Sequence, residues 1–184
     1  KLIESGIQLD EIKVIHDDIN IIKKNVIEFH RKYTYVFTTG GIGPTHDDLT
    51  SESVSLAFNQ KYCFHQEAYN ILEKYYPKGE FNDGRKKMAK MPEKAKLIIN
   101  PLTAAPGFRV ENVYVLPGVP EIMKIMFESL LVNIKKGAPK KTISLSTNLF
   151  ESTIASELEK IQSKFPECDI GSYPFFNYIS KKGG

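Results

Sequence analysis

The stretch "VFTTGGIGPTHDDLTSES", from Val36 to Ser53, decides how the rest of this sequence is interpreted. It places three glycines, a proline and two adjacent aspartates between an apolar run and a helix-like run. The β-branched and aromatic residues of 33–39 predict a buried strand, and the spacing of 49–60 predicts a helix. A loop that follows a strand and opens a helix is the usual ligand position in open α/β sheets.

The segments on either side repeat this pattern. Residues 11–16 alternate apolar and polar side chains, which predicts a strand, and residues 17–33 have helical spacing behind a capping aspartate. Residues 113–131 again predict a strand, a Gly/Pro loop and a helix. This alternation predicts an α/β fold with a mostly parallel sheet and helices on its faces, over residues 1–137.

The last part of the chain predicts a small α+β extension over residues 138–184. A basic linker leads into 142–150, which is interpreted as a strand, and 151–165, which is interpreted as a helix. Residues 169–176 predict a last strand.

The amino-acid composition argues against some classes of function. The chain has 184 residues, of which 41% are hydrophobic and 26% charged, with a net charge of +3. The basic residues are spread without interleaved aromatics, so nucleic acid is not an expected partner. No apolar run reaches membrane-spanning length, so no membrane partner is expected. Two widely spaced cysteines suit a reducing, cytoplasmic setting.

The glycines of the opening stretch predict an anion site. Gly40, Gly41 and Gly43 lack a Cβ atom, so the backbone can turn sharply and present its N–H groups to a ligand. The following helix adds partial positive charge at its N-terminus, which favours phosphate. The loop is not a P-loop, because no Lys-Ser/Thr pair follows, and it lacks the third glycine of a dinucleotide fingerprint.

The two aspartates point to a metal-assisted phosphate site. Asp47 and Asp48 offer hard oxygen ligands for Mg²⁺ or another divalent ion such as Mn²⁺, which bridges carboxylates to substrate phosphates. Alternatively, Asp48 caps the helix and Asp47 is solvated. Glu121, at the start of a later helix, is a third candidate ligand, with an interaction with the helix dipole as the alternative.

Two further features leave alternatives open. Gly118, in "LPGVP", either lies against the ligand or supplies a positive φ for the turn between strand and helix. A short basic helix is predicted over residues 83–93. Its residues Arg85, Lys86 and Lys87 either hold a second phosphate or form a solvated face.

Four motifs resemble one family. "TTGGIGPTHDDLT" is similar to the signature of the molybdopterin-binding-domain superfamily, in the branch of competence/damage-inducible protein A and of the N-terminal domain of eukaryotic FAD synthase. "APGF", "LPGVPEIM" and "IGSYP" resemble the same family in the same order. The likeness extends over nearly the whole chain.

The resemblance implies a three-layer α/β/α domain in which the GGxGPT and PGVP loops enclose the ligand. It implies divalent-metal-dependent hydrolysis of a diphosphate linkage in ADP-ribose or FAD, with Asp47 and Asp48 catalytic. A homo-oligomer, either a dimer or a trimer, is the expected assembly. The ligand-binding residues expected by this likeness are Thr39, Gly40, Gly41, Gly43, Pro44, Thr45, Pro117, Gly118 and Val119.

Two other functions remain open at this stage. One is binding of molybdopterin or a related phosphorylated ligand without hydrolysis, and the other is a degenerate domain that serves oligomerisation or regulation. Family members usually begin with a strand and loop resembling "IIxIGDELL", whereas "KLIESGIQL" resembles the end of the following helix. The expectation is therefore that this first strand is missing from the sequence.

Overall fold

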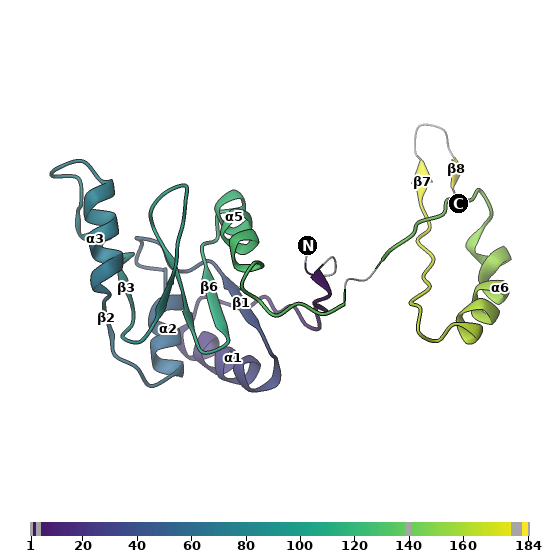
Figure 1. Cartoon of the computed structure of the whole chain (residues 1–184), viewed down its shortest axis with the longest axis horizontal. Helices are drawn as coiled ribbons and strands as arrows, with labels where there is room; N and C mark the ends of the chain where they lie inside the picture. The colour runs from purple at the N-terminus through teal and green to yellow at the C-terminus, as the bar shows by residue number, and fades with distance from the viewer. Residues whose placement is uncertain (1, 3–4, 139–140, 178–181, 184) are drawn as a thin grey trace. The chain divides into compact units, whose positions relative to one another are not determined.

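The computed structural model describes residue 2 and residues 5–138, 141–177 and 182–183. The chain forms two compact units, Lys1–Lys140 and Lys141–Gly184 (Figure 1). Each unit is described by itself below.

The first unit is built on a four-stranded sheet with the order β1-β6-β5-β4. β1 and β6 are parallel. β6 pairs with β5, and β5 pairs with β4, in antiparallel orientation. The predicted α/β fold class is confirmed. Among the strands that the structure describes, the parallel pair in this sheet is formed by β1 and β6. The strands are β1 (Val36–Thr39), β4 (Lys96–Ile98), β5 (Gly107–Val110) and β6 (Val113–Leu116).

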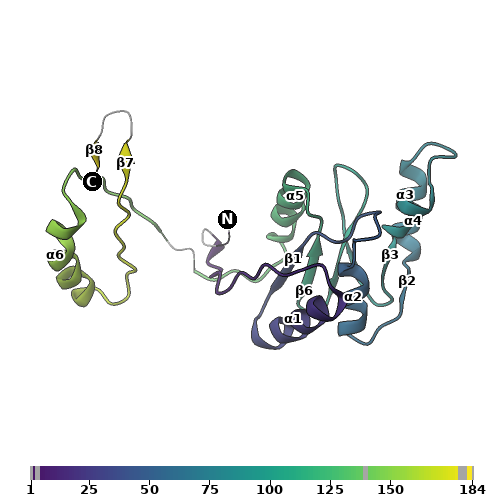
Figure 2. The same ribbon diagram turned by 180° about the vertical axis from the view of Figure 1, so that it is seen from behind.

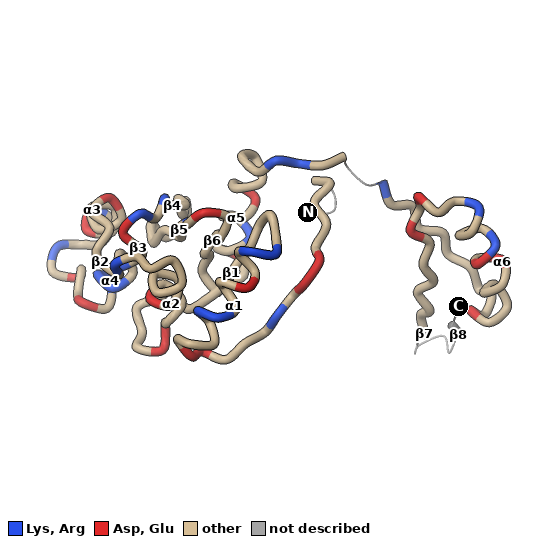
Figure 3. The backbone as a smooth tube through the Cα atoms, turned by 90° about the horizontal axis from the view of Figure 1, so that it is seen from below, with Lys and Arg blue, Asp and Glu red and all other residues tan. Residues whose placement is uncertain are grey.

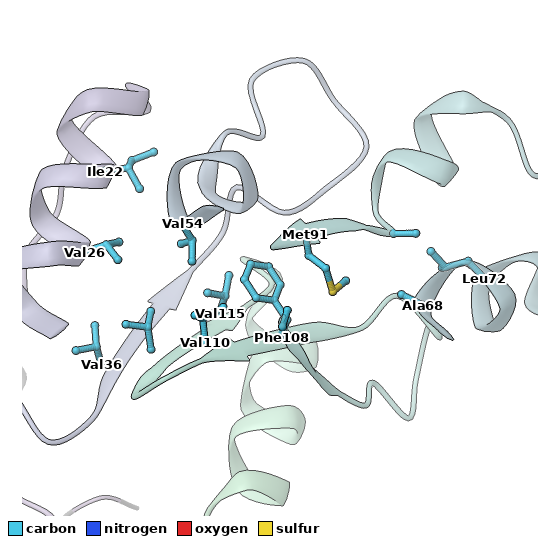
Figure 4. Packing of buried hydrophobic residues seen from close by; sticks show 13 residues of the cluster. Ile22, Val26, Val36, Val54, Ala68, Leu72, Met91, Phe108, Val110 and Val115 are labelled. Atoms are coloured by element: carbon cyan, nitrogen blue, oxygen red, sulfur yellow. The ribbon is translucent and has the colours of Figure 1, made fainter. Parts of the chain in front are cut away.

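Helices cover both faces of this sheet, so the three-layer arrangement is confirmed. Alternate residues of β6 point to opposite faces. Val113 and Val115 join the cluster formed with α1 (Ile19–Lys32) and α2 (Thr50–Ala57). Tyr114 and Leu116 instead join Met126 of α5 (Pro120–Leu130). Figure 4 shows the first cluster, with side chains of α1 and α2 above those of β1, β5 and β6.

Both ends of α1 are fixed by side chains. The carboxylate of Asp18 accepts hydrogen bonds from the backbone N–H groups of Asn20 and Ile21, at 2.8 and 2.9 Å. At the other end, the side-chain amide of Asn112 donates to the carbonyls of His30 and Tyr33. Helix ends leave such groups unpaired, so these contacts define where α1 begins and ends.

A smaller layer packs beside the sheet. β2 (Tyr62–Phe64) and β3 (Lys90–Pro92) form an antiparallel pair, with α3 (Gln66–Tyr75) and α4 (Asp83–Lys87) between them in the chain. The helix predicted over residues 83–93 is wrong beyond Lys87, because residues 90–92 form β3 and pair with β2 instead.

The strand predicted at residues 11–16 is wrong. This segment has no regular structure, and the side chains of Ile12 and Val14 are 75% and 95% exposed. Residues 8–15 and 34–39 are among those that line a cavity of about 840 Å³. The segment belongs to no sheet of the described structure, and alternation alone does not make a strand.

The second unit contains α6 (Glu151–Lys164) and the two-residue strands β7 (Phe176–Asn177) and β8 (Lys182–Gly183). The strand predicted at 142–150 is wrong, since these residues are irregular and Ile143 and Leu145 are 84% and 92% exposed. None of the residues 141–175 is buried. In the described part of the whole chain, no helix is long and apolar enough to cross a membrane.

Candidate functional site

Two loops leave the sheet side by side. We call residues 40–49 the first loop and residues 117–119 the second loop. β1 and β6 are parallel neighbours, and Thr39 is paired with Leu116 at their carboxyl ends. The first loop and the second loop therefore start at the same sheet edge, as Figure 2 shows from behind. The backbone N–H of Gly40 donates to the carbonyl of Leu116 at 3.0 Å, which ties the loops together.

Gly118 lies in tight contact with the start of the first loop. A Cβ atom on Gly118 would lie 3.2 Å from the Cα atom of Gly40, which is tighter than an ordinary contact. Gly118 does not have a positive φ, so the alternative that it only supplies a left-handed turn is wrong. On either side of it, Pro117 and Val119 complete the second loop, and Val119 is the N-cap residue of α5.

The first loop begins with two left-handed glycines. Gly40 has φ +91° and Gly41 has φ +69°, a region that other residues avoid. The carbonyl of Gly41 accepts a hydrogen bond from the backbone N–H of Thr50 at 2.9 Å, which joins the loop to the first residue of α2. Thr39, Gly40 and Gly41 also line the 840 Å³ cavity.

Asp48 closes the first loop on itself. Its Oδ2 atom accepts hydrogen bonds from the backbone N–H of Thr45 at 2.9 Å and from the Thr45 hydroxyl at 2.5 Å. The N-cap residue of α2 is Leu49, and no side chain caps that helix. The alternative in which Asp48 caps α2 is therefore wrong. A Cβ on Gly43 would lie 2.7 Å from Oδ2, so a larger residue there would displace this carboxylate.

Both aspartates are held in the ionised form. Burial raises the pKa of Asp48, but hydrogen bonds from the Thr45 hydroxyl and from the backbone N–H groups of Gly43 and Thr45 outweigh it, and the net pKa is lowered. The pKa of the exposed Asp47 is also lowered, chiefly by the Thr45 hydroxyl. In the structure the hydrogen bond of the Thr45 hydroxyl goes to Asp48.

The third candidate metal ligand lies elsewhere. Glu121 is in the first turn of α5, where a carboxylate interacts favourably with the helix dipole. Within the residues that the structure describes, no three His, Cys, Asp or Glu side chains are close enough to hold a metal ion. Asp47, Asp48 and Glu121 therefore do not form a three-carboxylate cluster.

Lys87 belongs to the candidate site, but the sequence did not distinguish its role from those of Arg85 and Lys86. Its ammonium group donates to the carbonyls of Thr45 and Asp48, the latter at 3.1 Å, although it comes from α4. Its neighbours face other partners, since Arg85 pairs with Glu80 and Lys86 pairs with Asp83. The run of three basic residues gave no sign of which one would reach the loop.

A family model described as "Probable molybdopterin binding domain" matches residues 1–136. The chain belongs to this molybdopterin-binding domain family. A second model, described as "FAD synthase, middle domain", matches residues 141–182. The resemblance found in the four sequence motifs is thereby confirmed at the level of the family.

Individual relatives agree with this assignment. A protein of Archaeoglobus fulgidus is 37% identical over 182 residues, which cover 99% of this chain and 78% of that protein. A CinA-like protein of Petrotoga mobilis is 29% identical over 161 residues, 83% of this chain and 40% of the relative. The crystal structure of CinA from Thermoplasma acidophilum, whose function is given as unknown, matches with a TM-score of 0.64. That match has 30% sequence identity and covers 70% of this chain and 78% of the other.

Proposed function

We propose that this chain is a divalent-metal-dependent hydrolase of the diphosphate linkage in nucleotides of the ADP-ribose or FAD type. The observation that carries the proposal is the position of two ionised aspartates in a glycine loop, at the edge where β1 and β6 both end. Backbone N–H groups of such loops bind phosphate, and the adjacent carboxylates suit a cation that bridges to it.

The donor set fits a magnesium-like ion. Mg²⁺ is commonly bound through one or two protein carboxylates together with waters and substrate phosphates, so a three-carboxylate cluster is not required. Asp47 is exposed and accessible, and Asp48 is held in place by Thr45. These two side chains would hold the ion, which when bound supplies Lewis acidity and an activated water.

The chain's own residues bind and orient the substrate. Gly40 and Gly118 keep the two loops close enough for their backbones to face one diphosphate. The N-terminus of α2 follows the first loop and favours the negative charge of the phosphates.

The first experiment measures release of AMP from ADP-ribose and from FAD by chromatography, with Mg²⁺ or with excess chelator. We expect turnover only with the divalent ion. Asp47→Asn and Asp48→Asn should each lower kcat by at least about tenfold, since each removes a charged ligand. Undiminished turnover in excess chelator would exclude the metal mechanism. If both variants were as active as the parent protein, a role of the two aspartates in catalysis would be excluded.

A second candidate function is binding of a molybdopterin-like ligand without hydrolysis, which the match of residues 1–136 to the molybdopterin-binding model favours. Calorimetry with a phosphorylated pterin distinguishes the two. Binding of the pterin, with no hydrolysis of any dinucleotide across several divalent ions, would favour this second function.

A further inference from the structure

The short helix α4 reaches the first loop with one of its three basic side chains. Arg85 pairs with Glu80 at 3.0 Å and lies over the ring of Tyr76 at 4.1 Å from its centroid. Lys86 pairs with Asp83 at 3.2 Å. Lys87 instead donates to two carbonyls of the first loop, those of Thr45 and Asp48. Figure 3 shows this helix as part of a basic segment of the tube.

The helix α4 packs against the first loop, and hydrogen bonds before and after Lys87 fix its position. A Cβ atom on Gly84 would lie 3.6 Å from the Cβ and the carbonyl oxygen of Pro44, so the helix backbone lies against the loop. Asn82 caps α4 by accepting the backbone N–H of Arg85 at 3.0 Å. After the helix, Ala89 is fully buried and its carbonyl accepts the backbone N–H of His65. Lys87 is therefore held at the loop by structure on both sides of it.

The two carbonyls that Lys87 contacts flank the aspartate pair. Thr45 precedes His46 and Asp47, and the second carbonyl belongs to Asp48 itself. An ammonium group has three donors and can bond both carbonyls at once. Its positive charge also offsets the repulsion between two neighbouring carboxylates, and it lowers the pKa of both.

We propose that Lys87 is a positioning residue, which fixes the backbone of residues 45–48 so that both aspartates face the same ligand. The claim that this positioning matters for turnover rests on the proposed function. The positioning itself does not, because it concerns the conformation of the loop in the free protein.

The test compares Lys87→Met with Lys86→Met in the full chain. Both variants remove one lysine charge from the same helix, but only the first removes the contacts with the loop. Hydrogen exchange of the backbone amides of residues 42–49 is measured by mass spectrometry, together with the melting temperature. We expect exchange about tenfold faster in Lys87→Met and unchanged in Lys86→Met, because hydrogen bonds to a charged donor restrain local opening.

Rescue and activity complete the experiment. Lys87→Arg keeps a charged donor and should restore exchange to within about twofold of the parent. If Lys87→Met does not fold, Lys87→Gln takes its place. Loop exchange equal to that of the parent in the neutral variant would overturn the proposal.

Kinetics separate this inference from the proposed function. In the AMP-release assay, Lys87→Met should lower kcat about tenfold with a smaller change in KM, since the aspartates remain present but are misplaced. Altered exchange with unaltered kcat would overturn the link to catalysis. If the parent protein hydrolyses no dinucleotide, the proposed function fails, and the exchange data still decide whether Lys87 positions the loop.

Discussion

Gly40 and Gly41 have similar left-handed backbones but different surroundings, which makes them a matched pair. A Cβ on Gly40 meets only the Cα of Gly118 at 3.9 Å, whereas a Cβ on Gly41 would lie 2.1 Å from the Oγ1 atom of Thr50. Gly40→Ala should cost about 1 kcal/mol of folding stability, from backbone strain alone. Gly41→Ala should cost distinctly more, because the buried Thr50 must also move.

Chemical denaturation of the two variants measures this difference. Equal losses of unfolding free energy would show that contact with Thr50 adds nothing to the backbone strain. Gly79→Ala is a suitable control, since Gly79 also has a positive φ but has no neighbouring atom within 4 Å of a Cβ position.

For individual residues, the sequence indicated which residue types the loops need better than it indicated what each residue does. The glycines, prolines and aspartates of the loops were identified because their chemistry is local. Asp48 was open between ligand and helix cap. The structure excludes the cap and shows Asp48 bound to Thr45 within its own loop, while the ligand role stays a prediction. The role of Lys87 depends on a contact between distant parts of the chain, so no local pattern could reveal it.

Among the elements, β2 carries a residue whose ionisation opposes folding at high pH. Burial raises the pKa of Tyr62 to about 12, with smaller effects from the negative charges of Glu52 and Asp48. In the unfolded chain the tyrosine loses its proton near pH 10, whereas the folded protein keeps it. The stability contributed by this group is therefore complete below pH 10 and falls as the pH rises toward 12.

A series of melting temperatures between pH 8 and 12 tests this. We expect the decline of the parent protein above pH 10 to be weaker in Tyr62→Phe, which has no ionisable group at this position. Tyr75→Phe serves as the control, because Tyr75 is 52% exposed. If the melting temperatures of the parent and of Tyr62→Phe change identically with pH, ionisation of Tyr62 does not contribute to the decline.

The helices were easier to predict than the strands, for a physical reason. α1 carries its own signals, namely a capping side chain and helical spacing, and it was found close to its predicted bounds of 17–33. A strand instead needs a neighbour for its hydrogen bonds. Residues 11–16 and 142–150 have the alternating pattern but no partner strand in the described structure, so both predictions were wrong.

For the whole molecule, the two compact units differ in what stabilises them. All the buried hydrophobic side chains of the described structure lie between Ile22 and Ile134. None of residues 141–175 is buried. We therefore expect residues 1–140, produced alone, to unfold cooperatively, and residues 141–184, produced alone, to show no cooperative transition.

Calorimetry of the two fragments checks this expectation. A sharp transition in residues 141–184, or a failure of residues 1–140 to melt cooperatively, would contradict it. The assembly into a dimer or trimer stays a prediction from the sequence, and sedimentation of the full chain beside the fragment 1–140 would measure it.

The contact between Gly40 and Gly118 also bears on how the chain can be redesigned. The backbones at these two positions share one small space, although they belong to different strand-to-helix connections. A library that varies each position separately would misjudge both, since the tolerance for a methyl group at one depends on what occupies the other. The two positions are therefore best mutated as a pair.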